Sequence, residues 1–226
     1  MPTPTVAIVV AAGAGVRMGA PVPKALMPLA GRPMLAWSLD ALRACDRIAA
    51  IVVVAPPGLE DEVAAVAGAG AIVVPGGDSR AESVREGLRA APPGATVALV
   101  HDAARPLVTP DLLGAVIDGV EGADGAIAAA PAADTLKRAG EGGFIEDTVP
   151  RQGLWAAQTP QAFHLHVLAS AVEAAEEEGR LAAATDCASL LEARGGHVRL
   201  VESRAPNLKV TTPADATLAE ALLKAR

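Results

Sequence analysis

Near the start of the chain, a glycine-rich segment carries two positive charges of the kind that bind phosphate. Residues 9–19 have the sequence VVAAGAGVRMG, and Pro23 and Lys24 follow shortly after. A strand that ends in small residues lets backbone N–H groups approach a phosphate closely, and Arg17 and Lys24 would add charge. The segment therefore predicts a triphosphate-binding loop. A glycine-rich turn with Arg17 and Lys24 facing solvent is the alternative.

Two familiar phosphate-binding patterns do not describe this loop. The Walker loop requires Gly-Lys followed by Ser or Thr, which is absent, and the dinucleotide fingerprint requires a third glycine where Met18 stands. No acidic residue follows about twenty positions later to hold a ribose. These departures count against a nicotinamide-dependent dehydrogenase.

A second segment, residues 76–84, has the sequence GGDSRAESV and directly follows an expected strand. Its two glycines permit close approach of a nucleobase or ribose. Asp78, Arg80 and Ser83 offer hydrogen bonds at a helix start. An N-capped turn with no ligand would have the same pattern.

The third segment, residues 101–106, has the sequence HDAARP at the end of another expected strand. At that position Asp102 suits a metal-bound phosphate, and Arg105 suits the phosphate of an acceptor substrate. A local ion pair between Asp102 and Arg105 is the alternative. His101 has no nearby ligand partners in the sequence, so we assign it no catalytic role.

The composition argues against several classes of function. The net charge is −7 and aromatic residues make up 2% of the chain, which disfavours a nucleic-acid partner. Cys45 and Cys187 are too few and too far apart for a disulfide framework or a zinc site, and they fit a reducing cytoplasm. Apolar runs are interrupted well short of about eighteen residues, so we expect no membrane association.

The order of the expected elements predicts the fold that must position these segments. Short β-branched runs alternate with helical stretches, which favours an α/β fold with a doubly wound, mostly parallel sheet and ligands beyond the carboxyl ends of its strands. The expected strands are 6–10, 51–54, 72–74, 97–100, 126–129 and 197–201. The expected helices are 33–45, 59–66, 81–90, 110–120, 164–178, 185–193 and 213–224, with Ser79 and Thr109 as N-caps of the third and fourth.

After Pro131 the alternation of strands and helices stops, which predicts a hairpin arm. Residues 135–138 and 144–149 flank a glycine-rich turn. Two strands alone are only marginally stable, so we expect the arm to pack on a partner subunit. The prediction is a single domain over residues 1–226 with a β-arm at about 132–155 inserted for dimerisation.

Taken together and in order, the segments resemble the 2-C-methyl-D-erythritol 4-phosphate cytidylyltransferase family of the non-mevalonate isoprenoid pathway. The resemblance covers nearly the whole chain. Besides the three segments above, it rests on Asp134-Thr135-x-Lys137-Arg138, Thr159-Pro160-Gln161, Thr185-Asp186 and Asn207-x-Lys209-Val210-Thr211. The chain departs from the family pattern at Val10, where proline is frequent, at Ala25, where glutamine is frequent, and at Cys187, where an acid commonly stands.

The resemblance implies transfer of CMP from CTP to 2-C-methyl-D-erythritol 4-phosphate with release of pyrophosphate. It also implies Mg²⁺ as cofactor, a Rossmann-like nucleotidyltransferase fold, and a cytoplasmic homodimer in which Arg151 reaches the acceptor phosphate of the other subunit. The residues that it implies for catalysis are Arg17, Lys24, Arg151 and Lys209; for CTP, Ala11, Ala12, Gly13, Gly77, Asp78 and Ser83; and for the acceptor, Asp102, Arg105, Thr135, Thr159 and Thr185, with Asp102 also near the metal. Cytidylyltransferases for ribitol phosphate share much of this pattern, and a CTP-binding regulator without turnover is a further alternative.

Overall fold

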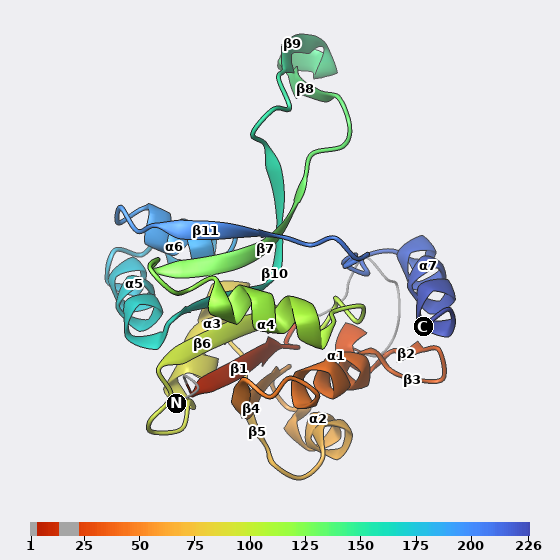
Figure 1. The fold of residues 1–226 in the computed structure, drawn as a ribbon, viewed down its shortest axis with the longest axis vertical. Coiled ribbons are helices and arrows are strands. Elements are labelled where there is room, and N and C mark those ends of the chain that lie inside the picture. Colours follow the sequence, from red (N-terminus) through yellow and green to blue (C-terminus); the bar gives the residue numbers. More distant parts are fainter. Residues whose placement is uncertain (1–3, 14–22) are drawn as a thin grey trace.

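A seven-stranded sheet forms the centre of the molecule (Figure 1). The computed structural model describes residues 4–13 and 23–226. The strands follow one another across the sheet in the order β11-β7-β10-β6-β1-β4-β5, and all neighbours are parallel except that β10 is antiparallel to both β6 and β7. Their bounds are β1 Thr5–Val10, β4 Ile48–Ala55, β5 Ala71–Pro75, β6 Val97–Asp102, β7 Gly125–Pro131, β10 Trp155–His164 and β11 Val198–Glu202.

Helices cover both faces of this sheet, as expected for a doubly wound fold (Figure 1). In β1, Ala7 and Val9 pack toward one set of helices, while Val6 and Ile8 pack toward the other. This two-sided burial explains why the strand is apolar without a gap. One face carries α1 Met34–Arg43, α2 Glu60–Ala67 and α4 Pro110–Asp118, and the other carries α3 Arg80–Arg89, α5 Leu165–Glu177 and α6 Cys187–Glu192.

The helices expected from the sequence are all present, with ends that differ by no more than two residues. The caps are also as predicted, since Ser79 accepts a hydrogen bond from the N–H of Glu82 and Thr109 accepts one from Leu112. The last helix, α7 Pro213–Lys224, packs beside the short strands β2 Pro28–Leu29 and β3 Arg32–Pro33 in a small separate core. In the described part of the chain, no helix combines the length and apolar character needed to cross a membrane.

Strand β10 was not expected from the sequence. Its segment is rich in alanine and contains Pro160, which cannot donate to a ladder and so argues against a central strand. The structure accommodates Pro160 at a register shift between Ala157 and Gln161 in the pairing with β7. This strand brings Thr159 and Gln161 to the end of β6.

Helix α3 lies unusually close to β1. A Cβ built on Gly87 would lie 2.3 Å from Ile8 Cγ2 and 3.1 Å from Val54 Cγ2, so glycine is the residue that allows this approach. The contact fixes the distance between the sheet and the helix whose first residue is Arg80.

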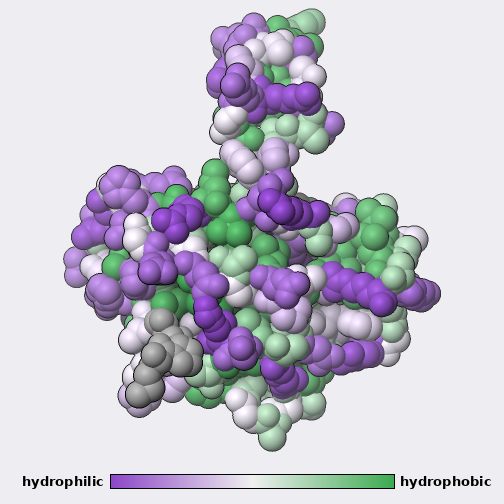
Figure 2. All heavy atoms as spheres, in the orientation of Figure 1, coloured by the Kyte–Doolittle hydropathy of each residue, from purple (hydrophilic) through white to green (hydrophobic). Residues whose placement is uncertain are grey.

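The expected arm is a hairpin formed by β8 Leu136–Ala139 and β9 Ile145–Val149, which extends well away from the body (Figure 1). Figure 2 shows it as a separate column of mixed hydrophilic and hydrophobic side chains. Near its tip, Phe144 is 79% exposed and Ile145 is 67% exposed. Neither side chain belongs to a hydrophobic core formed by the described residues.

Candidate active site

A cavity of about 460 Å³ opens at the carboxyl ends of β1 and β6. These strands are paired neighbours in the sheet, with Val10 opposite Asp102. The order of strands along the chain changes direction between β1 and β6. Doubly wound sheets bind their ligands at such a point. Its lining combines the three segments expected from the sequence with the loop after β11. The lining residues are Val10, Ala11, Ala12, Gly13, Lys24, Ala25, Gly77, Asp78, Ser79, Arg80, Ser83, Asp102, Ala103, Ala104, Lys209 and Thr211.

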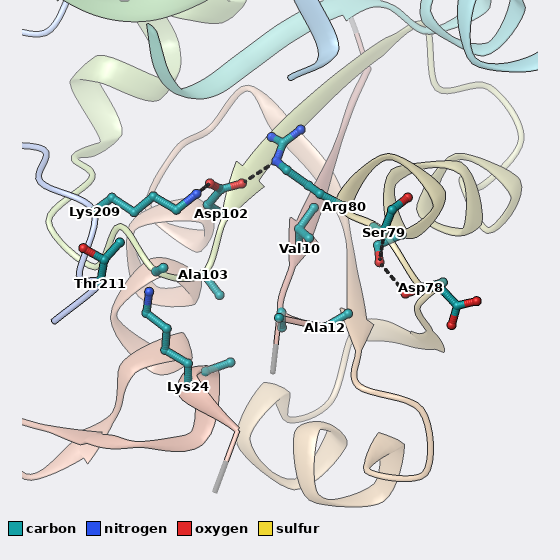
Figure 3. A pocket seen from close by; sticks show the side chains of 16 residues that line it. Val10, Ala12, Lys24, Asp78, Ser79, Arg80, Asp102, Ala103, Lys209 and Thr211 are labelled. Atoms are coloured by element: carbon teal, nitrogen blue, oxygen red, sulfur yellow. Dashed lines mark hydrogen bonds and ion pairs between the residues drawn. The ribbon is translucent and has the colours of Figure 1, made fainter. Parts of the chain in front are cut away.

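Two cations hold Asp102 at the cavity wall (Figure 3). Its Oδ1 accepts a hydrogen bond from Arg80 Nε at 3.1 Å, and its Oδ2 accepts one from Lys209 Nζ at 2.6 Å. Burial disfavours the charged carboxylate, but the charges of Arg80 and Lys209 outweigh burial and hold the pKa of Asp102 well below its usual range. Asp102 is therefore ionised at neutral pH and fixes the direction of both cations.

This pairing replaces the local ion pair that the sequence left open. Among the described residues, no ion pair joins Asp102 to Arg105. Instead, the Arg105 side chain is 9% exposed and its Nη1 donates to the carbonyl of Asn207 at 2.7 Å. Arg105 is not among the described residues that line the cavity.

The glycine-rich loop contributes its small residues as expected, with one difference. Ala11, Ala12 and Gly13 line the cavity, but the N–H of Ala11 already donates to the carbonyl of Val54 at 2.9 Å. The β1–β4 ladder thus extends one residue further than expected, and the N–H of Ala11 is not available to a phosphate. Lys24, on the short helix η2 Lys24–Leu26, extends its amine into the same cavity (Figure 3).

The second segment forms the opposite wall, and its glycines have a structural reason. A Cβ on Gly76 would lie 2.6 Å from Ala12 Cβ, and one on Gly77 would lie 2.4 Å from Glu82 Cβ. Contacts within the protein therefore exclude a side chain at either position. Ser83 lines the cavity, but its hydroxyl donates to the carbonyl of Ser79 at 2.9 Å, which leaves only its oxygen lone pairs for a ligand.

Several residues expected at the site lie elsewhere in this chain. Thr159 is buried behind Asp102, and Thr185 is exposed in the loop before α6. Thr135 and Arg151 lie at the arm, where Arg151 donates to the carbonyl of Ala133 and borders a second, shallow cavity of about 630 Å³. Arg17 belongs to residues 14–22, outside the described part of the chain. Of the described residues, Thr135, Arg151, Thr159 and Thr185 are not part of the main cavity lining.

Arg80, Ser79 and Thr211 all line the cavity, although none of them is among the residues that the family resemblance implies for catalysis, CTP or the acceptor. The sequence indicated Arg80 only as a hydrogen-bond donor at a helix start and Ser79 only as an N-cap. For Arg80 the signal was present, because it begins a helix directly after a strand end. The pairing of Arg80 with Asp102 could not be predicted from the sequence, because the two residues lie 22 positions apart. They meet because the sheet places β5, which precedes Arg80, and β6, which ends at Asp102, on the two sides of β4 and β1.

The cavity lining offers only part of what a divalent cation needs. Mg²⁺ is commonly bound through one or two carboxylates together with substrate phosphates. Asp102 provides a carboxylate at the cavity, but both of its oxygens accept hydrogen bonds from cations. Across residues 4–13 and 23–226, no group of three His, Cys, Asp or Glu side chains is placed to hold a metal. The site thus fits an ion held mainly by a phosphate ligand rather than by the protein.

Comparisons with known proteins agree with this geometry. A relative from Frankia casuarinae, a 2-C-methyl-D-erythritol 4-phosphate cytidylyltransferase, is 47% identical over 218 residues, covering 96% of this chain and 80% of its own. Another from Synechococcus sp. strain CC9902 is 43% identical and covers 97% of both chains. The crystal structure of the Thermus thermophilus enzyme of that name is 36% identical, with a TM-score of 0.82 over 96% of this chain and 98% of that one.

The family model for 2-C-methyl-D-erythritol 4-phosphate cytidylyltransferase (IspD) matches residues 5–225, which is nearly the whole chain. The doubly wound sheet, the cavity at its carboxyl edge and the full-length relatives all lead to one conclusion. This chain belongs to the 2-C-methyl-D-erythritol 4-phosphate cytidylyltransferase family.

Proposed function

We propose that this protein transfers CMP from CTP to 2-C-methyl-D-erythritol 4-phosphate, releasing pyrophosphate, in isoprenoid precursor biosynthesis. The observation that carries this is the cavity at the carboxyl edge of the sheet in a chain of this family. Among the described residues, its charged lining consists of three cations, Lys24, Arg80 and Lys209, and two carboxylates, Asp78 and Asp102. This excess of positive charge suits two phosphorylated substrates.

The reaction requires no nucleophilic side chain, because a phosphate oxygen of the acceptor attacks the α-phosphorus of CTP directly. A new P–O bond forms as the bond to pyrophosphate breaks. The protein then contributes positioning and charge stabilisation. Lys24 lies beside the small residues of the loop and stabilises charge on the triphosphate. Lys209, held by Asp102, directs the acceptor phosphate toward the α-phosphorus.

Mg²⁺ is part of this proposal as a partner of the triphosphate, and Asp102 is the residue of this chain that would face it. Bound in this way, the ion would withdraw charge from the phosphate oxygens and make pyrophosphate a better leaving group. Arg80 and Lys209 keep Asp102 ionised and in place for that contact.

A homodimer through the arm is also part of the proposal. The hairpin exposes Phe144 and Ile145 near its tip, and such side chains are expected to be covered by a partner. In a two-fold dimer, Arg151 at the base of the arm would serve the site of the other chain. The two free, buried cysteines support a cytoplasmic location.

A pyrophosphate-release screen tests the activity directly. CTP, UTP, ATP and GTP would each be combined with the phosphates of methylerythritol, ribitol and glycerol. We expect CTP with methylerythritol 4-phosphate to give the highest kcat/KM, by at least about tenfold. The Lys24→Ala variant, purified in the same way, controls for contaminating enzymes. A higher kcat/KM with ribitol 5-phosphate would make the chain a ribitol-phosphate enzyme instead.

Cys187 is one of the positions at which this chain departs from the family pattern, and the structure shows what a charge there would meet. Its Sγ accepts a weak hydrogen bond from Arg80 Nη1 at 3.6 Å, and burial raises the pKa of the thiol, so it is neutral at pH 7. We expect Cys187→Asp to fold, with an unfolding temperature at least equal to that of Cys187→Asn at pH 7, because Arg80 can pair with the new carboxylate. The KM for the acceptor should change by less than about threefold.

Thermal unfolding and steady-state kinetics of both variants give the answer. A much lower unfolding temperature for the Asp variant than for the Asn variant would show that the start of α6 cannot hold a charge even beside Arg80.

A further inference from the structure

His101 is completely buried on β6, beside the residue that holds the two cations. Its Nε2 lies 3.3 Å from the carbonyl oxygen of Arg105, and its Nδ1 lies 3.3 Å from Thr159 Oγ1. A carbonyl oxygen can only accept, so Nε2 must carry a proton. The complete burial of the ring favours its neutral form, which makes Nδ1 an acceptor.

The proton on Nε2 and the neutral charge of the ring set the direction of every hydrogen bond around it. The hydroxyl of Thr159 donates to Nδ1 of His101, and the same oxygen accepts the backbone N–H of Asp102 at 3.0 Å. His101 Nε2–H in turn donates to the carbonyl of Arg105, whose own N–H donates to the carbonyl of Asp102 at 2.9 Å. This series of hydrogen bonds, called the relay below, thus begins and ends in the turn from Asp102 to Arg105.

The relay lies where the backbone ladder between β6 and β10 stops. Pairing between these strands runs from His164 opposite Val97 to Gln161 opposite Val100. The next residue of β10, Pro160, has no N–H to donate. On its β10 side, the N–H of Asp102 is therefore held by a side chain, Thr159, whose hydroxyl is oriented by His101.

The same relay is connected to the loop that carries Lys209. The carbonyl of Thr159 accepts a hydrogen bond from Asn207 Nδ2 at 2.9 Å, and the carbonyl of Asn207 accepts one from Arg105 Nη1 at 2.7 Å. Two residues later, Lys209 reaches Asp102. Loss of the His101 ring would therefore affect both ends of the Asp102–Lys209 ion pair.

We propose that His101 is a positioning residue that, through the Thr159 hydroxyl, holds Asp102 in the orientation that directs Lys209 into the cavity. This inference rests on the proposed function, in which Lys209 orients the acceptor. A histidine with only a structural role would also be buried, but its hydrogen bonds would not determine the position of the Asp102 backbone.

The kinetic test uses variants that remove the hydrogen bonds and keep the volume. His101→Phe and Thr159→Val should each lower kcat and raise the KM for the acceptor, giving about a three- to tenfold loss in kcat/KM per variant, as expected for one lost buried hydrogen bond. The KM for CTP should change by less than about twofold. Thr159→Ser keeps the hydroxyl and should recover most of the activity. Because both substitutions break the same relay, the kcat/KM of the double variant should be about that of the more impaired single variant.

Val172→Ala, on α5 and remote from the cavity, controls for general destabilisation. It should lower the unfolding temperature without changing the KM for either substrate. Additive losses in the double variant, or equal changes in the KM for both substrates that track stability, would assign His101 a structural role only.

Two measurements need neither activity nor folded variants of His101. Nitrogen NMR of the wild-type protein should show the His101 proton on Nε2, and a proton on Nδ1 alone would overturn the relay. Amide hydrogen exchange should show the Asp102 N–H protected in the wild type and faster in Thr159→Val, whereas equal protection would contradict the proposal. If no substrate pair releases pyrophosphate, the proposed function fails, while these two results still decide whether the relay exists.

Discussion

Replacing Lys24 by alanine will lower kcat by about two orders of magnitude or more and leave the unfolding temperature nearly unchanged. Lys24 lies on the short helix η2 and extends its amine into the cavity that Ala12 and Lys209 also line. A charge at that position acts mainly when negative charge builds up on the leaving pyrophosphate, so its loss affects the transition state more than the ground state. Steady-state kinetics with CTP and the acceptor, together with calorimetry, measure both quantities.

Lys224→Ala provides the matched control, because it removes the same charge from the exposed end of α7. It should leave kcat within about twofold of the wild-type value. The sequence predicts a loss for Arg17→Ala similar to that for Lys24→Ala. Near-normal turnover in both loop variants would mean that this segment is a structural turn and that the triphosphate is bound elsewhere.

A second large effect is expected when two inactive variants are combined. If each site uses Lys24 of its own chain and Arg151 of the partner, Lys24→Ala and Arg151→Ala should each be nearly inactive. In a mixed dimer, one site then has both residues and the other has neither. With random pairing, half of the dimers are mixed and half of their sites are intact, so about a quarter of wild-type activity should return. Co-expression with two different affinity tags allows the mixed dimer to be isolated and assayed.

The structure supplies a matched negative control for this experiment. Lys24 and Lys209 line the same cavity of one chain. A mixture of Lys24→Ala with Lys209→Ala should therefore produce no intact site in any dimer and should stay inactive. Isolated mixed dimers of Lys24→Ala and Arg151→Ala that remain inactive would mean that Arg151 serves its own chain or no site at all.

Much of the site follows from the sequence because parallel strands end at one edge. Once the segments after β1, β5 and β6 are recognised, the geometry of a doubly wound sheet requires Ala12, Gly77 and Asp102 to converge, and they do. Lys24 was predictable for the same reason, as the first cation after the loop. Lys209 was placed there by the family resemblance alone.

The pairing of charges could not be predicted in this way. Asp102 faces Arg80 and Lys209 rather than the nearby Arg105, because its side chain direction depends on how β6, α3 and the loop after β11 pack. Strand β10 was missed because its alanines and Pro160 carry no strand signal, although burial between β6 and β7 overrides local preference. The family resemblance implies Thr159 at the acceptor, and in the structure its hydroxyl oxygen accepts the backbone N–H of Asp102.

Gly87 lies outside the cavity lining but controls the position of a residue that belongs to it, Arg80. This residue lies seven positions after Arg80, about two turns along the same helix, and it is not among the described residues that line the cavity. Any side chain there would push α3 away from Ile8, and a stiff helix would transmit that displacement to its first turn, where Arg80 binds Asp102. A mutagenesis library limited to residues that line the cavity would therefore not include Gly87. A chance substitution at Gly87 would disturb the site although every lining residue was unchanged.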